Sequence, residues 1–234
     1  MLILGIETAT SQVGCALADQ SGLLAAARSG VPRRHAESLA PQIDFVCRQA
    51  GVTPRDIRVV AVDVGPGLFT GLRVGMATAL ALAHALGAPM VGVSSLDLVA
   101  FPARFTSRTI VAVLDARRGE VFHARYRPVP GGIQREGEAA VGRPDEVAAE
   151  ITARGDETLV VGDGALAHRE VFDGIAEVEI ADGCFAHPTA TALVELAHAR
   201  AVREEFVRPD QIAPVYLRRP DAQAHWGDPV GGAA

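Results

Sequence analysis

Runs of hydrophobic residues mark a set of closely spaced strands at the start of the chain. Residues 2–8 are almost entirely apolar and predict a buried strand, and residues 13–18 and 23–28 predict two further strands that follow through short polar turns. A helical spacing of apolar residues then extends from 35 to 49. Three strands followed by a helix are typical of a sheet with helices packed against it.

A second apolar run, residues 59–62, leads through a glycine-rich turn into a helix over 72–86. The turn is Gly65-Pro-Gly-Leu-Phe-Thr-Gly-Leu-Arg-Val-Gly75. A glycine-rich turn between a strand and a helix can present backbone N–H groups to an anion, but this spacing matches neither the P-loop nor G-x-G-x-x-G. Alternatively, Gly71 and Gly75 let the helix press closely on a neighbouring segment. The spacing alone leaves both interpretations open.

The helix predicted over 72–86 is apolar on nearly every side, because five alanines alternate with Met76, Leu80 and Leu82. A helix of this kind must be buried on more than one side. In a small lobe, part of that surface is available for a partner.

The second half of the chain repeats the first in weaker form. Residues 109–114 and 120–126 predict two strands, and 158–161 predicts a strand that ends at Gly162-Asp-Gly164. Residues 128–137 are rich in turn formers and predict a loop. We therefore predict a duplicated α/β architecture with an N-terminal lobe at 1–105, a C-terminal lobe at 106–217 that includes a helix at 188–205, and a disordered tail at 218–234.

Composition and charge narrow the class of protein. The chain has 234 residues, 49% of them hydrophobic, and a net charge of -6, which argues against tight RNA binding by this chain alone. Cys15, Cys47 and Cys184 are odd in number and lie in apolar contexts, which indicates reduced core thiols. No signal peptide is evident, and Gly87 and Pro89 end the longest apolar run. We expect a cytoplasmic protein without a membrane span.

Five segments of the chain form a recognisable set: Gly5-Ile-Glu-Thr-Ala-Thr10, Arg34-His-Ala-Glu-Ser38, the glycine stretch Gly65 to Gly75, Gly92-Val-Ser-Ser-Leu-Asp97 and Asp115-Ala-Arg-Arg-Gly-Glu-Val121. In this order they resemble the TsaB (YeaZ) family, and the resemblance extends over residues 2–217. It implies the actin-like ATPase (ribonuclease H-like) fold, with two lobes that each hold a mixed five-stranded sheet flanked by helices. It also implies a dimerization subunit of the bacterial machinery that attaches threonylcarbamoyl to N6 of adenosine 37 in tRNAs reading ANN codons.

The resemblance also implies that this chain is not the enzyme of that machinery. The catalytic paralogue TsaD holds its metal with a His-x-x-x-His pair, and the matching positions here are Ser95 and Val99. Valine cannot bind a metal, and a neutral serine is a poor ligand. We therefore expect no metal site and no catalytic residues.

The nucleotide site of actin-like ATPases has only weak counterparts in this chain. Glu7 and Thr8 occupy the place of the first phosphate turn, and Gly162 and Gly164 occupy that of the glycine turn in the second lobe. Both segments can also be simple tight turns, and no lysine follows the first. We expect no intrinsic cofactor and at most weak binding of an adenine nucleotide. The alternative function is an active ATPase or phosphotransferase.

The expected role is therefore a scaffold. The implied partners are a TsaD-type paralogue in a heterodimer and a TsaE-type P-loop ATPase, with tRNA bound only through the complex. Alone, the chain is expected to form a homodimer through the same surface. Small and apolar residues on the helices near 35–50 and 72–86 predict the interface, with the following partner-binding residues: Leu39, Ile43, Leu72, Met76, Ala79 and Leu80.

Overall fold

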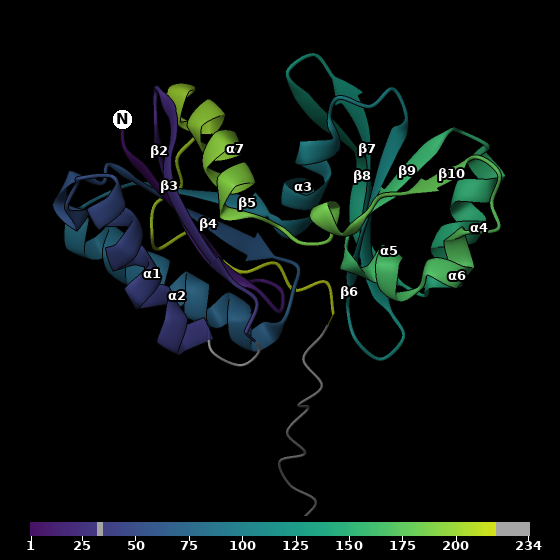
Figure 1. Ribbon diagram of the computed structural model, residues 1–234, viewed down its shortest axis with the longest axis horizontal. Coiled ribbons are helices and arrows are strands. Elements are labelled where there is room, and N and C mark those ends of the chain that lie inside the picture. Colours follow the sequence, from purple (N-terminus) through teal and green to yellow (C-terminus); the bar gives the residue numbers. More distant parts are fainter. Residues whose placement is uncertain (32–34, 219–234) are drawn as a thin grey trace, which may run out of the picture.

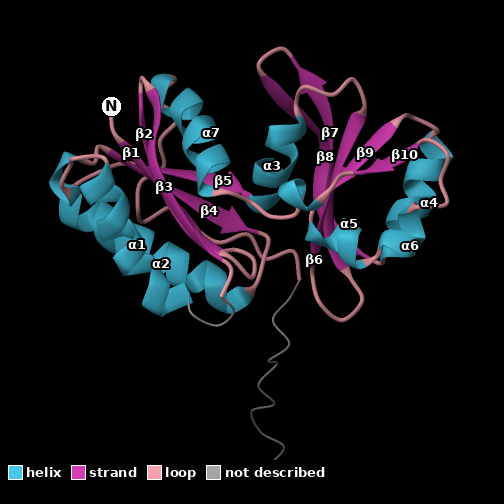
Figure 2. Ribbon diagram, viewed as in Figure 1, coloured by secondary structure: helices cyan, strands magenta, loops and turns pink. Residues whose placement is uncertain are grey.

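The computed structural model describes residues 1–31 and 35–218, which form two lobes side by side (Figure 1). Each lobe contains a five-stranded sheet, in the order β3-β2-β1-β4-β5 in the first and β10-β9-β6-β7-β8 in the second. Read from its other edge, the second sheet repeats the order of the first. This duplication, with helices flanking both sheets, confirms the predicted actin-like fold (Figure 2).

The first lobe contains both antiparallel and parallel strand pairs. The β1–β2 and β2–β3 pairs are antiparallel, whereas β1–β4 and β4–β5 are parallel. The elements are β1 (Ile3–Glu7), β2 (Val13–Asp19), β3 (Gly22–Ser29), α1 (His35–Gln49), η1 (Pro54–Asp56), β4 (Val59–Gly65), α2 (Phe69–Leu86) and β5 (Met90–Ser94).

The second lobe follows after a short helical connection. The elements from there on are α3 (Ser95–Ala100), η2 (Phe101–Ala103), β6 (Thr109–Asp115), β7 (Val121–Val129), β8 (Gly132–Gly142), α4 (Pro144–Arg154), β9 (Thr158–Val161), α5 (Asp163–Ala167), α6 (Arg169–Phe172), β10 (Val178–Ile180), η3 (Gly183–Phe185) and α7 (Ala190–Val202).

Helices cover both faces of the first sheet. Leu4 and Ile6 of β1 belong to a core shared with α1 and α2, whereas Ile3 belongs to a core shared with α7. A strand that is buried on both faces is apolar at every position, which explains why the first strand is a continuous hydrophobic run.

The end of the chain returns to the first lobe, which corrects the predicted limits of the second. We predicted that residues 106–217 form one lobe, but α7 packs on the first sheet. Val207 then bridges to Met90, and the Val215 N–H donates to the Val64 carbonyl at 2.7 Å. The apolar second face of the first sheet needs a cover, and this late helix supplies it. The predicted tail, apart from Arg218, lies outside the described residues.

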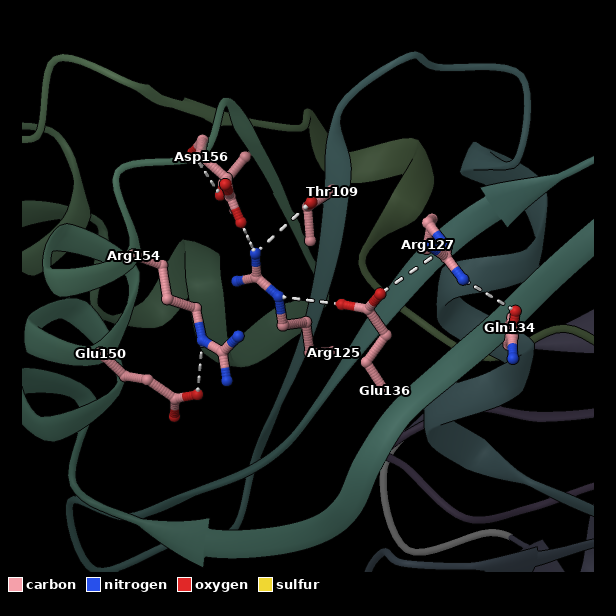
Figure 3. A network of polar contacts seen from close by, with 9 residues as sticks. Thr109, Arg125, Arg127, Gln134, Glu136, Glu150, Arg154 and Asp156 are labelled. Atoms are coloured by element: carbon pink, nitrogen blue, oxygen red, sulfur yellow. Dashed lines mark hydrogen bonds and ion pairs between the residues drawn. The ribbon is translucent and has the colours of Figure 1, made fainter.

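Strand β8 occupies much of the segment that we predicted as a loop at 128–137. It is a half-exposed edge strand paired with β7, so its polar residues give no hydrophobic signal. A polar network ties it to its neighbours (Figure 3). The buried Arg125 guanidinium contacts Glu136 of β8 at 3.3 Å and also pairs with Asp156 before β9. Charge pairing therefore holds this strand where hydrophobic burial does not.

Helix α2 and the cysteines bear on two further expectations. By length and composition alone the 18-residue α2 reaches the range of a membrane span, but 33% of it is buried in the first lobe, Leu72 and Met76 among the buried residues, and the absence of a membrane span stays a prediction. Cys15 and Cys47 are buried as predicted, but Cys184 is exposed on η3. Its apolar sequence neighbours do not enclose it, because η3 lies at the surface of the second lobe.

Candidate functional site

The glycine stretch after β4 lies directly against the turn after β1. A Cβ atom at Gly71 or Gly75 would overlap with Thr8, because the helix backbone already touches that residue. The Thr8 hydroxyl donates to the Gly71 carbonyl at 2.8 Å, and the Leu68 N–H donates to the Ala9 carbonyl at 2.7 Å. Of the two interpretations of this motif, close packing is therefore the one that the structure supports, and the neighbour is the chain's own first turn.

Two acidic side chains are buried side by side behind this turn. Glu7 ends β1 and Asp63 lies next to it on β4, and each is only 1% exposed. Glu7 accepts the Ala9 N–H at 2.8 Å, and Asp63 accepts the Ser95 hydroxyl at 2.6 Å. The second oxygen of Asp63 is buried without a hydrogen-bond partner.

Burial changes the charge of this pair. Desolvation raises the pKa of Glu7 well above its usual range, and the neighbouring Asp63 raises it further. Burial likewise raises the pKa of Asp63 to about 7. Two adjacent carboxyls cannot both ionise at low cost, so the pair retains a proton near neutral pH. Glu7 thus belongs to a buried pair that does not carry the full charge of two free carboxylates.

The glycine turn of the second lobe is also packed from within. Gly162 has a φ of +110°, and a Cβ there would overlap with the Val113 carbonyl of β6. A Cβ at Gly164 would lie 2.9 Å from the Leu114 carbonyl carbon. Between them, Asp163 accepts the Asp115 N–H at 3.0 Å. These glycines permit close contact with β6.

The two turns face one another across the lobes but leave little room between them. Ala9, Thr10 and Leu68 of the first lobe line a cavity with Asp115 and Asp163 of the second. Its free volume is about 10 Å³, roughly that of one water molecule. In this arrangement the space does not accommodate a phosphate group, so nucleotide binding stays a prediction for which the geometry offers no support.

Ser95 and Val99, which match the metal-ligand positions of the paralogue, have structural roles in this chain. Ser95 is fully buried and donates to Asp63, and Val99 lies in the hydrophobic core of the second lobe. Within residues 1–31 and 35–218, no group of three or more His, Cys, Asp or Glu side chains is placed to hold a metal ion.

The residues predicted to bind a partner lie on the inner side of α1 and α2. All but Leu80, which is half-buried, are buried against the first sheet, so they do not form an exposed seam: Leu39, Ile43, Leu72, Met76 and Ala79. The reason is the helical period, because residues 39 and 43, like 72, 76 and 79, recur on one face.

The exposed side of the same two helices carries a different set of apolar residues. Phe45 on α1 is 44% exposed, and Ala77 and Ala81 on α2 are exposed one turn apart. Both helices lie on the outside of the lobe, away from the second lobe (Figure 1). We call Phe45, Ala77 and Ala81 the outer helix face. The sequence marks these residues as apolar positions that fall outside the helical period of the buried face.

Comparison with known proteins identifies the family. The family model "TsaD: tRNA N6-adenosine threonylcarbamoyltransferase" matches residues 29–226. The chain is 32% identical to the tRNA threonylcarbamoyladenosine biosynthesis protein TsaB of Escherichia coli, over 93% of this chain and 95% of that protein. The chain belongs to the TsaB (YeaZ) family. The chain is also similar to the solved structure of YeaZ from Pseudomonas aeruginosa, with a TM-score of 0.82 and 29% identity over 92% of this chain and 99% of the other.

Another relative is longer than this chain. The uncharacterised protein ML0378 of Mycobacterium leprae is 37% identical over 95% of this chain, but the chain spans only 56% of its length.

The turn between β6 and β7 is formed by the segment Asp115-Ala-Arg-Arg-Gly-Glu120, one of the five on which the resemblance rests. The backbone of Arg117 and Arg118 has left-handed φ angles of 64° and 59°, which residues other than glycine and asparagine rarely adopt. The Arg117 N–H donates to the Asp115 carboxylate at 2.7 Å, and Glu120 pairs with Arg218 at the end of the described chain. Local pairing therefore holds this TsaB turn in a strained shape and ties the C-terminal segment to the second lobe.

Proposed function

We propose that this chain is the scaffold subunit that binds and activates a TsaD-type transferase in the formation of N6-threonylcarbamoyladenosine at position 37 of tRNAs reading ANN codons. Its TsaB relatives are named for that biosynthesis. The observation that carries the scaffold role is the outer helix face of Phe45, Ala77 and Ala81, which is apolar and exposed on two adjacent helices. A tRNA-modifying complex would act in the cytoplasm.

The outer helix face suits a helix-to-helix contact. Alanines one turn apart let a partner helix approach closely, and Phe45 supplies a large exposed apolar side chain on the neighbouring helix α1. One face cannot hold two partners at once, so a homodimer of this chain competes with the heterodimer. A TsaE-type ATPase and an enzyme supplying threonylcarbamoyl-adenylate complete the activity, and tRNA binds through the complex.

The packing of the cleft supports a non-catalytic role. The cleft between the two turns has about 10 Å³ of free volume, which is too little for a phosphate group. The Ser95 hydroxyl is buried and donates to Asp63, so it is not available as a nucleophile. The alternative of an active ATPase has no comparable observation in its favour.

Reconstitution tests the proposal. The purified chain is mixed with the TsaD-type paralogue, the TsaE-type ATPase and the enzyme that makes threonylcarbamoyl-adenylate, and tRNA modification is measured. Ala81→Glu places a charge on the outer helix face and should prevent heterodimer formation, self-association and modification without lowering the melting temperature. Ala149→Glu, a matched change at an exposed alanine of α4, should alter none of them.

Two results would contradict the proposal. The non-catalytic role is wrong if the chain alone modifies tRNA, or hydrolyses ATP at about one turnover per second or faster, after repurification and metal chelation. The interface is misplaced if the Ala81→Glu variant binds the paralogue as tightly as the unmodified chain does.

A further inference from the structure

The end of the described chain runs from the first lobe to the second (Figure 1). Before this crossing the chain is held on the first lobe, because Val207 bridges to Met90 and Ile212 packs against the core of that lobe. After it, Leu217 packs against the core of the second lobe. We call residues 215–218, which make the crossing, the strap.

One end of the strap is attached to the first-lobe wall of the cleft between the lobes. The Val215 N–H donates to the Val64 carbonyl at 2.7 Å. Next to it, the centroid of the Tyr216 ring lies 5.6 Å from that of Phe69, the first residue of α2. Leu68, which lines the cleft, directly precedes Phe69. The strap therefore holds the segment between β4 and α2 that forms this wall.

The other end of the strap is attached to the second-lobe wall of the cleft. The Arg218 guanidinium donates to the Ala116 carbonyl at 3.0 Å and the Arg117 carbonyl at 3.4 Å, and it also pairs with Glu120. All three acceptors belong to the turn between β6 and β7, and Asp115 and Arg117 of this segment line the cleft. A guanidinium suits several acceptors at once because it presents five N–H donors in one plane. One side chain of the strap thus holds the second wall.

Helix α3 provides a separate connection between the lobes. Leu98 packs against the first-lobe core and Leu96 against the second-lobe core. Between them, Asp97 pairs with Arg200 of α7 at 3.7 Å and with Arg135 of β8 at 2.5 Å. Two lobes joined by a short helical connection can rotate about it unless other contacts prevent the motion. The strap supplies such contacts, because it joins the two walls of the cleft.

We propose that the strap holds the cleft between the lobes closed, and that release of Arg218 from the β6–β7 turn lets the lobes rotate about α3 and opens the cleft. The free volume of about 10 Å³ then depends on the strap and is not a fixed property of the two sheets. The strap does not itself line the cleft, so its release exposes the walls only if the lobes move apart. The inference involves no residue of the outer helix face and does not depend on the scaffold role.

Thiol labelling inside the cleft tests the strap. Thr10 lines the cleft and is 5% exposed, so Thr10→Cys places a probe there. The full chain is labelled with iodoacetamide, and peptide mass spectrometry measures each cysteine separately. Cys184 is exposed and reports the activity of the reagent, whereas Cys15 and Cys47 are buried in the first-lobe core and report unfolding. In this background Arg218→Gln should raise the labelling rate of the cleft thiol about tenfold or more, because labelling follows the population of the open form.

Matched variants separate release of the strap from a general loosening of the fold. Arg154→Gln also removes one partner of an exposed ion pair, with Glu150 within α4, and should leave the labelling rate unchanged. Leu217→Ala combined with Arg218→Gln removes both contacts of the strap with the second lobe and should raise the rate further. The two buried cysteines should stay unlabelled in every variant. The proposal is overturned if the double variant is labelled in the cleft as slowly as the chain with an intact strap, or only together with the buried cysteines.

Discussion

Replacing Gly75 with alanine tests whether the glycine stretch is a packing motif. At an exposed helix position this change stabilises a protein by about 1 kcal/mol. At Gly75 the added Cβ would overlap with the Thr8 hydroxyl and lie 3.3 Å from the Thr8 Cβ. Thr8 must move and lose its hydrogen bond to the Gly71 carbonyl. Overpacking of about 1–3 kcal/mol and a lost hydrogen bond of about 1 kcal/mol outweigh the helix gain, so the net destabilisation is about 1–3 kcal/mol.

A double-mutant cycle separates this contact from a general effect on the helix. Thr8→Ala removes the overlapping atoms, so Gly75→Ala should cost about nothing in that background, which gives a coupling of about 1–3 kcal/mol. Urea unfolding followed by circular dichroism measures each variant. Gly174→Ala is the control, because nothing lies within 4 Å of a Cβ there, and it should change stability by less than about 0.5 kcal/mol.

The reasoning fails if Gly75→Ala is as stable as the unmodified chain, or if its cost is the same with and without the Thr8 side chain. Either result would mean that the glycines do not serve the contact with the first turn. The anion-binding interpretation of the stretch would then have to be considered again.

Three further predictions concern buried charge. The pKa of Asp63 is about 7 in the folded state and near 4 in the unfolded state. Its contribution to stability is therefore complete below pH 4 and is lost as the pH rises through 7. Between pH 5 and pH 8 the melting temperature of the Asp63→Asn variant should increase relative to that of the unmodified chain. Arg125→Ala should destabilise the second lobe by about 1–3 kcal/mol in urea unfolding, because it removes the buried guanidinium that hydrogen-bonds to Glu136 and Asp156. Arg127→Ala, at an exposed position of the same network, should cost less than about 1 kcal/mol (Figure 3). Met76→Glu places a carboxylate in the core and should lower the free energy of unfolding by several kcal/mol. The adjacent change Ala77→Glu, at an exposed position, should leave the melting temperature nearly unchanged and affect only association. Equal melting temperatures for the two variants would contradict the assignment of the helix faces.

Local patterns in the sequence determined much of the fold. Period-two and continuous apolar runs predicted the three N-terminal strands, and the helical spacing over 35–49 coincides with α1. The repetition of the pattern predicted the duplicated architecture, and the five motifs identified the family. These features depend on neighbours in the chain, so the sequence carries them directly.

Only the tertiary structure determines which part of the chain packs against each helix face and each glycine. The sequence showed that the helix after the glycine stretch is apolar nearly all round, but not that Met76 faces the sheet while Ala77 and Ala81 face outward. It showed glycines at 71 and 75, but not that Thr8 fills the space beside them.

Long-range packing explains the remaining differences. The chain supplies α7 to the first sheet after completing the second, and it holds the polar edge strand β8 by charge pairs with Arg125. The strand register likewise places Glu7 and Arg28 on either side of Gly14, on three different strands. Such contacts join residues far apart in the chain, and their energy depends on which surfaces meet in space, which no local period of the sequence encodes.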